Sequence, residues 1–366
     1  MFSRRRFLQL SSVLPMILSA HAVARAENNP SARAYYMPEE GHKHTCTWMA
    51  FGASQAIWGK RLLPAVQDNL ATLANTIARY EPVKLLVRDR DYELAAEKCS
   101  DGVELIVHPL DDLWMRDTGT IFVQHANDQL AGVDFNFNGW GNKQGHQNDA
   151  TVAHFMCEHA NIPRVSTDLV MEGGSIEVDG EGTAIATESC ILNNNRNPGW
   201  TKKECEAELK YLLGIEKMIW LPGVAGKDIT DGHTDFYARF TQPTVVVNGL
   251  ESDPSFDDYQ ITREHQRILE KATDAKGRRL KVVNLEAPST IRPAFENAEF
   301  AAGYIGFYVA NKVVIAQNFG DSQADQRTKR ILQDLFPDRR IEMLNLDAIA
   351  AGGGSAHCAT QQQPFV

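Results

Sequence analysis

The 366-residue sequence has no apolar run of roughly 18 to 20 residues, the length that a membrane-spanning helix requires. It also lacks proline-rich linkers, and neither the G-x-G-x-x-G nor the G-x-x-x-x-G-K-[ST] pattern of nucleotide-binding loops occurs in it. Only six cysteines are present, and no two of them form the C-x-x-C pair that is typical of zinc knuckles. The sequence therefore argues against a membrane-spanning protein, a nucleotide-binding protein and a structural zinc protein.

Basic residues are in the minority, with 37 Lys and Arg against 47 Asp and Glu, for a formal net charge of -10. A chain of this charge is repelled by polyanions, which argues against nucleic acid and anionic membranes as partners. The same balance is compatible with a cationic substrate. Whether the chain forms a homo-oligomer is left open.

The first 26 residues have the features of an export signal rather than of a folded segment. Arg4-Arg5 precede an apolar stretch over 8–20, and Ala24-Arg25-Ala26 is the small-x-small pattern of a cleavage site. We expect a twin-arginine signal over residues 1–26, a single domain over residues 27–366, and a periplasmic or secreted location; the alternative is a disordered basic N-terminus. Removal of the segment takes away four arginines and no acids, so the net charge becomes about -14.

All six cysteines lie after that segment. If the chain is exported as expected, it reaches an oxidising compartment, where disulfides are permitted. Their spacing does not indicate a disulfide framework, so we expect most of them to be buried as small apolar residues. The pairing of five of them is left open: Cys46, Cys99, Cys157, Cys190 and Cys205.

The remainder of the chain alternates between helical and extended patterns. Helices are expected over 62–80, 92–98, 149–160, 201–213, 257–275 and 323–336, and strands over 83–87, 103–107 and 245–248. Hairpins are expected over 175–186 and 304–316, and Thr201 with Glu204 forms a capping box at the start of one helix. The pattern predicts an α/β fold, and its hairpins argue against an all-parallel doubly wound sheet.

Four short runs each place an ionisable side chain beside glycine, where the backbone can turn sharply or approach a ligand. They are W-M-R-D-T-G at 114–119, M-E-G-G-S at 171–175, D-G-H-T-D at 231–235 and G-G-G-S-A-H-C at 352–358. Cys358 in the last run is either a buried thiol of a C-terminal tail or a nucleophile, since a thiolate is the strongest common nucleophile near neutral pH.

His233 and Asp235 stand two positions apart, the spacing at which a strand places two side chains on one face. A histidine beside a carboxylate suits general acid/base chemistry, although a structural histidine is the alternative. Asp117 and Glu172 add two more carboxylates, which taken singly are typical of solvated turns. Together, a thiol, an imidazole and three carboxylates suit a planar guanidinium, which carboxylates bind through paired hydrogen bonds.

These runs give the chain a clear resemblance to the agmatine deiminase and bacterial peptidyl-arginine deiminase family, from Tyr36-Met37-Pro38 to Gln361-Gln362. Further landmarks are T-W-M-A at 47–50, F-N-G-W-G at 137–141, L-N-N-N-R-N-P at 192–198, F-G-D at 319–321 and the C-terminal G-G-G-x-x-H-C-x-T-Q-Q. The resemblance implies a pentein fold, which is a five-bladed α/β propeller of ββαβ modules.

The same resemblance implies the roles of the site residues. Cys358 aligns with the nucleophile, His233 with the general acid/base, and Asp117, Glu172 and Asp235 with the guanidinium-binding carboxylates. It implies a hydrolase that converts a guanidinium of the agmatine or arginine type to a ureido product and ammonia through a covalent thiouronium on cysteine, without a metal or another cofactor. Trp114 is expected to line the substrate pocket, although a packing role is the alternative.

Two positions depart from the family pattern. Ile229 stands where agmatine-cleaving members commonly have an acid, and Gly306 stands where the family usually has asparagine. Agmatine, free arginine, an arginine side chain of a peptide, and a non-catalytic guanidine-binding role therefore remain alternatives. A second cluster with metal-like spacing, His154, Cys157 and His159, is interpreted as part of a helix with a structural or surface role.

Overall fold

The computed structural model describes residues 35–125 and 127–366 of the chain. The predicted export signal over residues 1–26 lies outside these described residues. Within them, no helix combines the length and the apolar character that crossing a bilayer requires.

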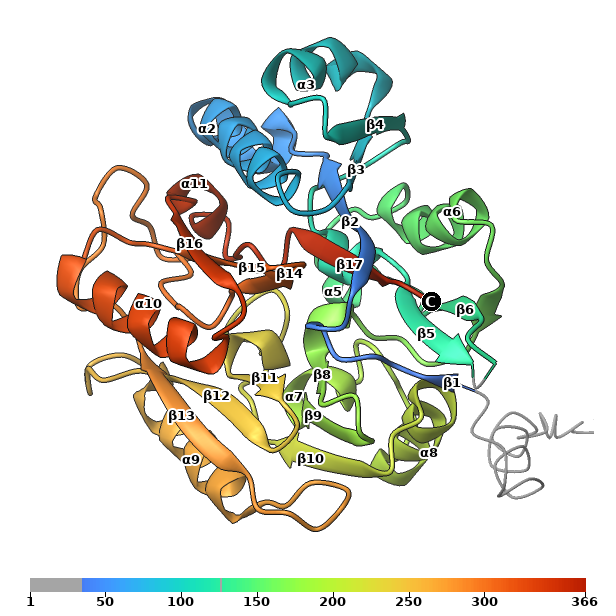
Figure 1. Cartoon of the computed structure of the whole chain (residues 1–366), viewed down its shortest axis with the longest axis vertical. Coiled ribbons are helices and arrows are strands. Elements are labelled where there is room, and N and C mark those ends of the chain that lie inside the picture. The colour runs from blue at the N-terminus through green and yellow to red at the C-terminus, as the bar shows by residue number, and fades with distance from the viewer. Residues whose placement is uncertain (1–34, 126) are drawn as a thin grey trace, which may run out of the picture.

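Five small sheets surround a central axis, with the long helices on the outside of the ring (Figure 1). The first sheet contains β17 (Thr360–Pro364), β2 (His44–Phe51), β3 (Val83–Val87) and β4 (Val103–Val107), with α2 (Gln55–Ile77) and α3 (Tyr92–Lys98). The second contains β1 (Tyr35–Tyr36), β5 (Ile121–His125), β6 (Leu130–Asp134) and β7 (Arg164–Ser166), with α6 (Val152–His159).

The other three sheets have three strands each. They are β8 (Ile176–Val178), β9 (Thr183–Thr187) and β10 (Lys217–Leu221) with α8 (Lys202–Leu213); β11 (Ala238–Gln242), β12 (Val245–Leu250) and β13 (Lys281–Glu286) with α9 (Asp258–Lys271); and β14 (Tyr308–Ala310), β15 (Val313–Gln317) and β16 (Arg340–Leu344) with α10 (Ser322–Leu335).

Each sheet repeats one module, in which an antiparallel pair is followed by a helix and a third strand parallel to the second. In the third sheet, for example, Ile176 of β8 pairs antiparallel with Ala186 of β9, and Lys217 of β10 pairs parallel with Thr183. The parallel step requires a crossover, and the helix supplies it. The predicted five-bladed propeller of ββαβ modules is confirmed.

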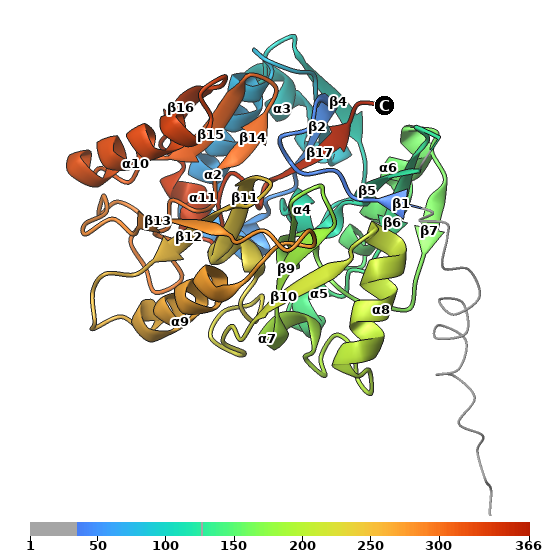
Figure 2. The same ribbon diagram turned by 60° about the horizontal axis from the view of Figure 1, so that its bottom comes forward.

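The first blade is closed by the last strand of the chain, which pairs with β2 near the start of the described residues. Strand β17 pairs antiparallel with β2, with Thr360 opposite Met49 and Gln362 opposite Thr47, and Figure 2 shows the two strands side by side. Every residue of β17 is buried. Because Cys358 precedes this strand by two residues, the sheet fixes the position of the segment that the sequence alone marks as a flexible tail.

Several predicted elements match the structure residue for residue, among them the strands at 83–87 and 103–107 and the helix at 92–98. The capping box of Thr201 and Glu204 at the start of α8 is also confirmed. Helix α2 begins earlier than predicted, and a break at Gly59, with φ of 66°, separates its first turn from the rest. Strand β14 begins only at Tyr308.

The minor helical elements lie in the connections. They are η1 (Asp89–Asp91), α4 (Met115–Thr118), α5 (Gly139–Asn142), η2 (Asp149–Thr151), η3 (Gly173–Ser175), α7 (Glu188–Ile191), η4 (Thr234–Phe236) and α11 (Asp347–Ala350). Three of them, α4, η3 and η4, immediately precede the first strand of a blade.

Candidate active site

The five predicted site residues all lie just before the first strand of a blade. Asp117 belongs to α4 before β5, and Glu172 precedes η3 and β8. His233 directly precedes η4, Asp235 lies within it, and β11 follows. Cys358 precedes β17. Segments far apart in the sequence therefore meet because the propeller places these equivalent connections around one axis.

Three of the five residues line one cavity of about 600 Å³: Asp117, His233 and Cys358. Its wall also includes the indole rings of Trp58, Trp114 and Trp140. A concave site with aromatic walls and a few convergent polar groups is typical of a small-molecule pocket.

The second glycine of the E-G-G-S run shows how closely the polar groups converge. A Cβ atom on Gly174 would lie 2.5 Å from Nδ1 of His233, 3.0 Å from Oδ1 of Asp117 and 3.1 Å from Oδ2 of Asp235. Any side chain at this position would displace at least one of the three, so the site requires glycine here for space.

The sulfur of Cys358 lies 3.8 Å from Oδ2 of Asp235 and 3.3 Å from the hydroxyl of Ser355. Burial raises the pKa of the Cys358 thiol, and the negative charges of Asp235 and Asp117 raise it further. The resting group is therefore a neutral thiol in front of carboxylates, and a bound cation would favour its ionisation.

Asp117 is held in place from two sides. The indole Nε1 of Trp140 donates to its Oδ2 at 2.9 Å, and the backbone N–H of Gly174 donates to its Oδ1 at 3.2 Å. Burial raises the pKa of Asp117 to about 6, with smaller contributions from Asp235 and Glu172. A cationic ligand that pairs with this carboxylate would offset part of the desolvation.

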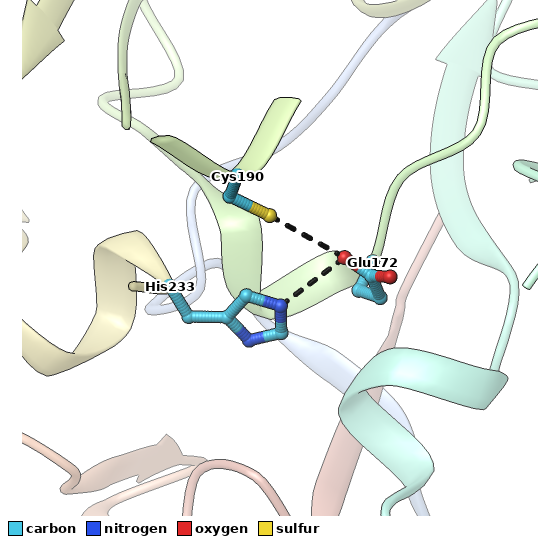
Figure 3. A group of neighbouring side chains, drawn as sticks. All are labelled: Glu172, Cys190 and His233. Carbon is cyan, nitrogen blue, oxygen red and sulfur yellow. Dashed lines mark hydrogen bonds and ion pairs between the residues drawn. The ribbon is translucent and has the colours of Figure 1, made fainter. Parts of the chain in front are cut away.

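Glu172 was predicted to be a carboxylate that binds the substrate, but in the structure it lies behind His233. It has no exposed surface, its Oε1 accepts from Nε of Arg196 at 2.9 Å, and its Oε2 accepts from Nε2 of His233 at 3.2 Å. The thiol of Cys190 also donates to Oε2, at 3.5 Å, as Figure 3 shows. Both oxygens are thus engaged by protein groups, and the carboxylate orients the imidazole.

Glu172, Cys190 and His233 form the one group of three potential metal ligands within the described part of the chain (Figure 3). The guanidinium of Arg196 already pairs with Glu172, and it also contacts Asp231 through Nη1 at 2.6 Å. A fixed cation in contact with the cluster opposes the binding of a second cation, so the donor set does not suit a resident metal ion.

His233 is almost fully buried, with 1% of its surface exposed. Burial lowers its pKa, but the negative charge of Asp117 and the hydrogen bonds with Cys190 and Glu172 outweigh this and raise the pKa well above the ordinary value. These contacts favour the protonated imidazolium over the neutral imidazole. The prediction that His233 and Asp235 alternate on a strand is wrong, because Asp235 lies in the 3-10 helix η4.

Asp235 connects the cysteine to a buried histidine. Its Oδ2 accepts from Nδ1 of His357 at 2.6 Å, and this hydrogen bond and the charge of His357 lower the pKa of Asp235 against the opposing effect of burial. Its Oδ1 is buried and has no hydrogen-bond partner among the described residues. A buried oxygen of this kind is costly unless a ligand satisfies it.

Sequence reasoning missed a second layer around these groups, centred on Glu40. Its carboxylate accepts from Nε2 of His357 at 2.8 Å, from Nη2 of Arg239 at 2.8 Å and from Nη2 of Arg116 at 3.0 Å. The only sequence signals are the arginine inside the W-M-R-D run and the histidine beside Cys358. Glu40 itself lies in an ordinary acidic pair.

Two of the three consecutive glycines pack against indole rings. A Cβ on Gly352 would lie 2.1 Å from Trp58, and one on Gly354 would lie 2.1 Å from Trp114. Both indoles donate to the buried carboxylate of Asp112, at 2.7 and 3.1 Å. Trp114 therefore lines the cavity and packs on the catalytic segment, so the two roles weighed from the sequence are both present.

Three further sets of residues were singled out from the sequence: the cysteines, the cluster on α6 and Ile229. All six cysteines are free in the structure. The His154, Cys157 and His159 cluster does not form a site, since His154 pairs with Glu158 on α6 and Cys157 is buried against Thr120. Ile229 is 37% exposed and lines the cavity.

A five-bladed α/β propeller with a cysteine, a histidine and carboxylates converging on one axial cavity defines a deiminase of the pentein class. Residues 36–364 match the model of the Porphyromonas-type peptidyl-arginine deiminase family, and the chain belongs to this family. It is therefore an enzyme that hydrolyses carbon–nitrogen bonds of linear amidines.

Relatives of similar length support this assignment. The agmatine deiminase of Stutzerimonas stutzeri is 37% identical over 361 residues, covering 92% of this chain and 97% of its own. That of the plant Medicago truncatula is 34% identical over 371 residues, covering 93% and 99%. The structure of the agmatine deiminase of Enterococcus faecalis superposes with a TM-score of 0.85 at 30% identity, covering 90% of this chain and 96% of that chain.

Proposed function

We propose that this enzyme is a guanidine deiminase that converts a guanidinium of the agmatine type to its ureido product and ammonia. The observation that carries the proposal is the placement of the Cys358 sulfur beside Asp235, with Asp117 and His233 on the same cavity. A flat cation satisfies this set, because carboxylates match its N–H donors and the thiol faces an electrophilic carbon.

Binding comes first. The guanidinium pairs with Asp117 and with the unpartnered Oδ1 of Asp235, which restores hydrogen bonding to a buried oxygen. The positive charge of the substrate offsets the two carboxylates that raise the pKa of Cys358, so the thiol loses its proton as the substrate docks. Glu172 remains behind His233 and holds its orientation.

The thiolate then adds to the guanidinium carbon and forms a carbon–sulfur bond. His233 donates a proton to the departing nitrogen, ammonia leaves, and an S-alkylthiouronium remains on Cys358. The neutral imidazole next removes a proton from water, whose oxygen adds to the same carbon. The carbon–sulfur bond breaks and the proton of the new hydroxyl group passes to the departing sulfur, which releases the neutral ureido product and regenerates the thiol and the imidazolium. The ammonia takes up the proton that the thiol lost when the substrate bound, so the second product is ammonium.

The cavity wall favours a substrate with a second positive charge over one with a carboxylate. Beyond Asp117 it includes five acids, which are Asp112, Asp228, Glu251, Asp258 and Glu299. Its one lysine, Lys227, is paired with Asp258 at 2.7 Å. This field attracts an amine tail and repels the free carboxylate of arginine. The peptidyl-arginine alternative rests on the family name and on Ile229, which places no acid at its position in the cavity wall.

A substrate panel tests the proposal. The protein without residues 1–26 is incubated with agmatine, arginine, a blocked arginine peptide and methylguanidine, and ammonia and ureido product are measured for each. Agmatine should have the highest kcat/KM. Cys358→Ala should lose at least roughly 10⁴-fold in rate while keeping its melting temperature. Absence of turnover with every guanidine, accompanied by thermal stabilisation by a guanidine, would replace catalysis by binding.

We further propose export through the twin-arginine signal over residues 1–26, which the paired Arg4 and Arg5, the following apolar stretch and the A-R-A run support. In a bacterial host with this export route, the enzyme should accumulate in the periplasm with Glu27 at its N-terminus. Arg4→Lys with Arg5→Lys should retain it in the cytoplasm, whereas Arg25→Lys should not. Cytoplasmic retention of the unmodified chain would refute export without affecting the assignment of the reaction.

A further inference from the structure

Four of the five blade entries bring ionisable side chains to the axis, and the fifth brings a glycine. Gly306 lies two residues before β14, and its carbonyl accepts from the backbone N–H of His357 at 3.1 Å. The entry to β14 is thus tied directly to the segment that contains Cys358.

Gly306 is required for space rather than for conformation. It is not among the residues with positive φ. A Cβ atom on it would lie 2.2 Å from Oγ and 2.3 Å from Cβ of Ser355, closer than two such atoms can approach. The missing side chain at position 306 therefore leaves the room that Ser355 occupies. The family's usual asparagine would not fit beside this serine.

The hydroxyl of Ser355 has one hydrogen-bond partner in the structure, the sulfur of Cys358 at 3.3 Å. Ser355 is 4% exposed, so the hydroxyl cannot rely on bulk water as an alternative. The backbone N–H of Ser355 also faces the sulfur. The other side chains that face it are ionisable: Asp235 from η4, Asp117 from α4 and His233 across the cavity, with His357 behind Asp235.

We propose that Ser355 is a catalytic residue that donates its hydroxyl hydrogen to the Cys358 thiolate, and that Gly306 is glycine because this hydroxyl needs the space. This inference rests on the proposed thiolate chemistry at Cys358. A neutral thiol and a hydroxyl can each donate to the other, but a thiolate only accepts, so ionisation fixes the direction of the bond. A charge-assisted bond from a neutral donor stabilises the sulfur anion between two carboxylates.

The bond acts twice in each turnover. It stabilises the thiolate that attacks the guanidinium carbon and again the thiolate that leaves when the thiouronium is hydrolysed. The hydroxyl makes no hydrogen bond with Asp117 or Asp235, the two carboxylates proposed to hold the substrate, so its loss should reduce kcat and leave KM nearly unchanged.

The test measures the sulfur directly, without substrate. Alkylation of Cys358 by iodoacetamide is followed as a function of pH in the unmodified protein and in Ser355→Ala, with Cys358→Ala identifying the labelled site. Loss of the donor should lower the thiolate fraction, so that the alkylation rate at a fixed pH falls about tenfold. The kcat with agmatine should fall roughly 10- to 100-fold, since removal of one preorganised donor has effects of about this size or larger.

A double-mutant cycle tests the role of Gly306. Gly306→Ala should displace the Ser355 side chain and reproduce the loss seen in Ser355→Ala. In a Ser355→Gly background the added methyl group has room, so Gly306→Ala should cause no further loss, and the two effects should be strongly non-additive. Gly145→Ala, at an exposed position whose Cβ would lie 3.8 Å from its nearest neighbour, is the matched control.

Unchanged alkylation rates and a kcat within twofold in Ser355→Ala would overturn the proposal, as would additive effects in the cycle. If Ser355→Ala proves unstable on thermal unfolding, Ser355→Gly replaces it, because it removes the same donor. If no guanidine in the substrate panel is turned over but Ser355→Ala still slows the alkylation of Cys358, the proposed reaction is refuted and the bond between Ser355 and Cys358 stands.

Discussion

Nε2 of His233 donates to Oε2 of Glu172 at 3.2 Å, deep below the cavity wall and without exposure of the carboxylate to solvent. The other oxygen of Glu172 is fixed by Arg196 at 2.9 Å. This arrangement separates the three carboxylates into two kinds. We infer that Asp117 and Asp235 bind the cation of the substrate, whereas Glu172 holds the imidazole through its hydrogen bond and favours its charged form.

Isosteric amides should distinguish the two kinds in steady-state kinetics. Glu172→Gln should lower kcat roughly 10²-fold with little change in KM, because the imidazolium loses its orienting charge. Asp117→Asn should raise KM at least tenfold, because a charge-assisted contact with the guanidinium is lost. An equal rise of KM in both variants would assign Glu172 to substrate binding after all.

The acid side of the pH–rate profile should report Asp117. Its carboxylate binds the cation only when ionised, and because its pKa is raised to about 6, kcat/KM should fall as pH decreases through about 6 rather than near 4. His233, with its raised pKa, stays protonated across this range.

Asp112 is the control for this assignment. Burial also raises its pKa to about 6, but its carboxylate accepts hydrogen bonds from the indoles of Trp58 and Trp114 and is not proposed to bind the guanidinium. Asp112→Asn should keep the same acid midpoint in a profile of kcat/KM against pH. If the acid midpoint shifts in Asp112→Asn, the fall of kcat/KM at low pH does not report the ionisation of Asp117.

Glu40 should be a centre of stability. It neutralises Arg239 and Arg116 in the interior, and these cations and His357 hold its pKa well below the ordinary value despite burial. Glu40→Gln should reduce the free energy of unfolding by roughly 3–5 kcal/mol, because removal of one partner leaves buried charges uncompensated. Urea denaturation followed by circular dichroism measures the change.

The adjacent Glu39 is the control for this variant. Its carboxylate accepts from the nearby backbone N–H of Gly41 and forms no buried cluster. Glu39 is only half-buried, so Glu39→Gln should reduce the free energy of unfolding far less than Glu40→Gln, by no more than about 1 kcal/mol. Equal losses in the two variants would contradict the assignment of a buried charge centre to Glu40.

Gly354 should tolerate no side chain, because a Cβ would meet Trp114 at 2.1 Å. Gly354→Ala should push the indole from the cavity wall, lower kcat/KM at least tenfold and shift tryptophan fluorescence. Gly353→Ala is the comparison, since φ is +86° there and the nearest atom to a Cβ would be 3.5 Å away. It should cost about 1–2 kcal/mol of stability through backbone strain, without the fluorescence shift.

Local sequence predicted local structure wherever a few neighbouring residues decide the outcome. The apolar run of β3 and the capping box at the start of α8 needed no distant partner. The glycine-flanked runs also marked the catalytic segments, because glycine beside an ionisable residue reflects crowding around a site. The strand assignment of His233 and Asp235 failed because spacing alone does not distinguish an extended pair from a turn of 3-10 helix.

The sequence by itself identified the candidate groups for the chemistry: a cysteine, a histidine and the acids beside them. Only the tertiary structure decided their division of labour. Arg239 reaches Glu40 across 199 positions of sequence, and Arg196 rather than a substrate occupies Glu172. The physical reason is that buried charge is stabilised only by a partner in contact, and the closure of five blades around one axis determines which partners those are.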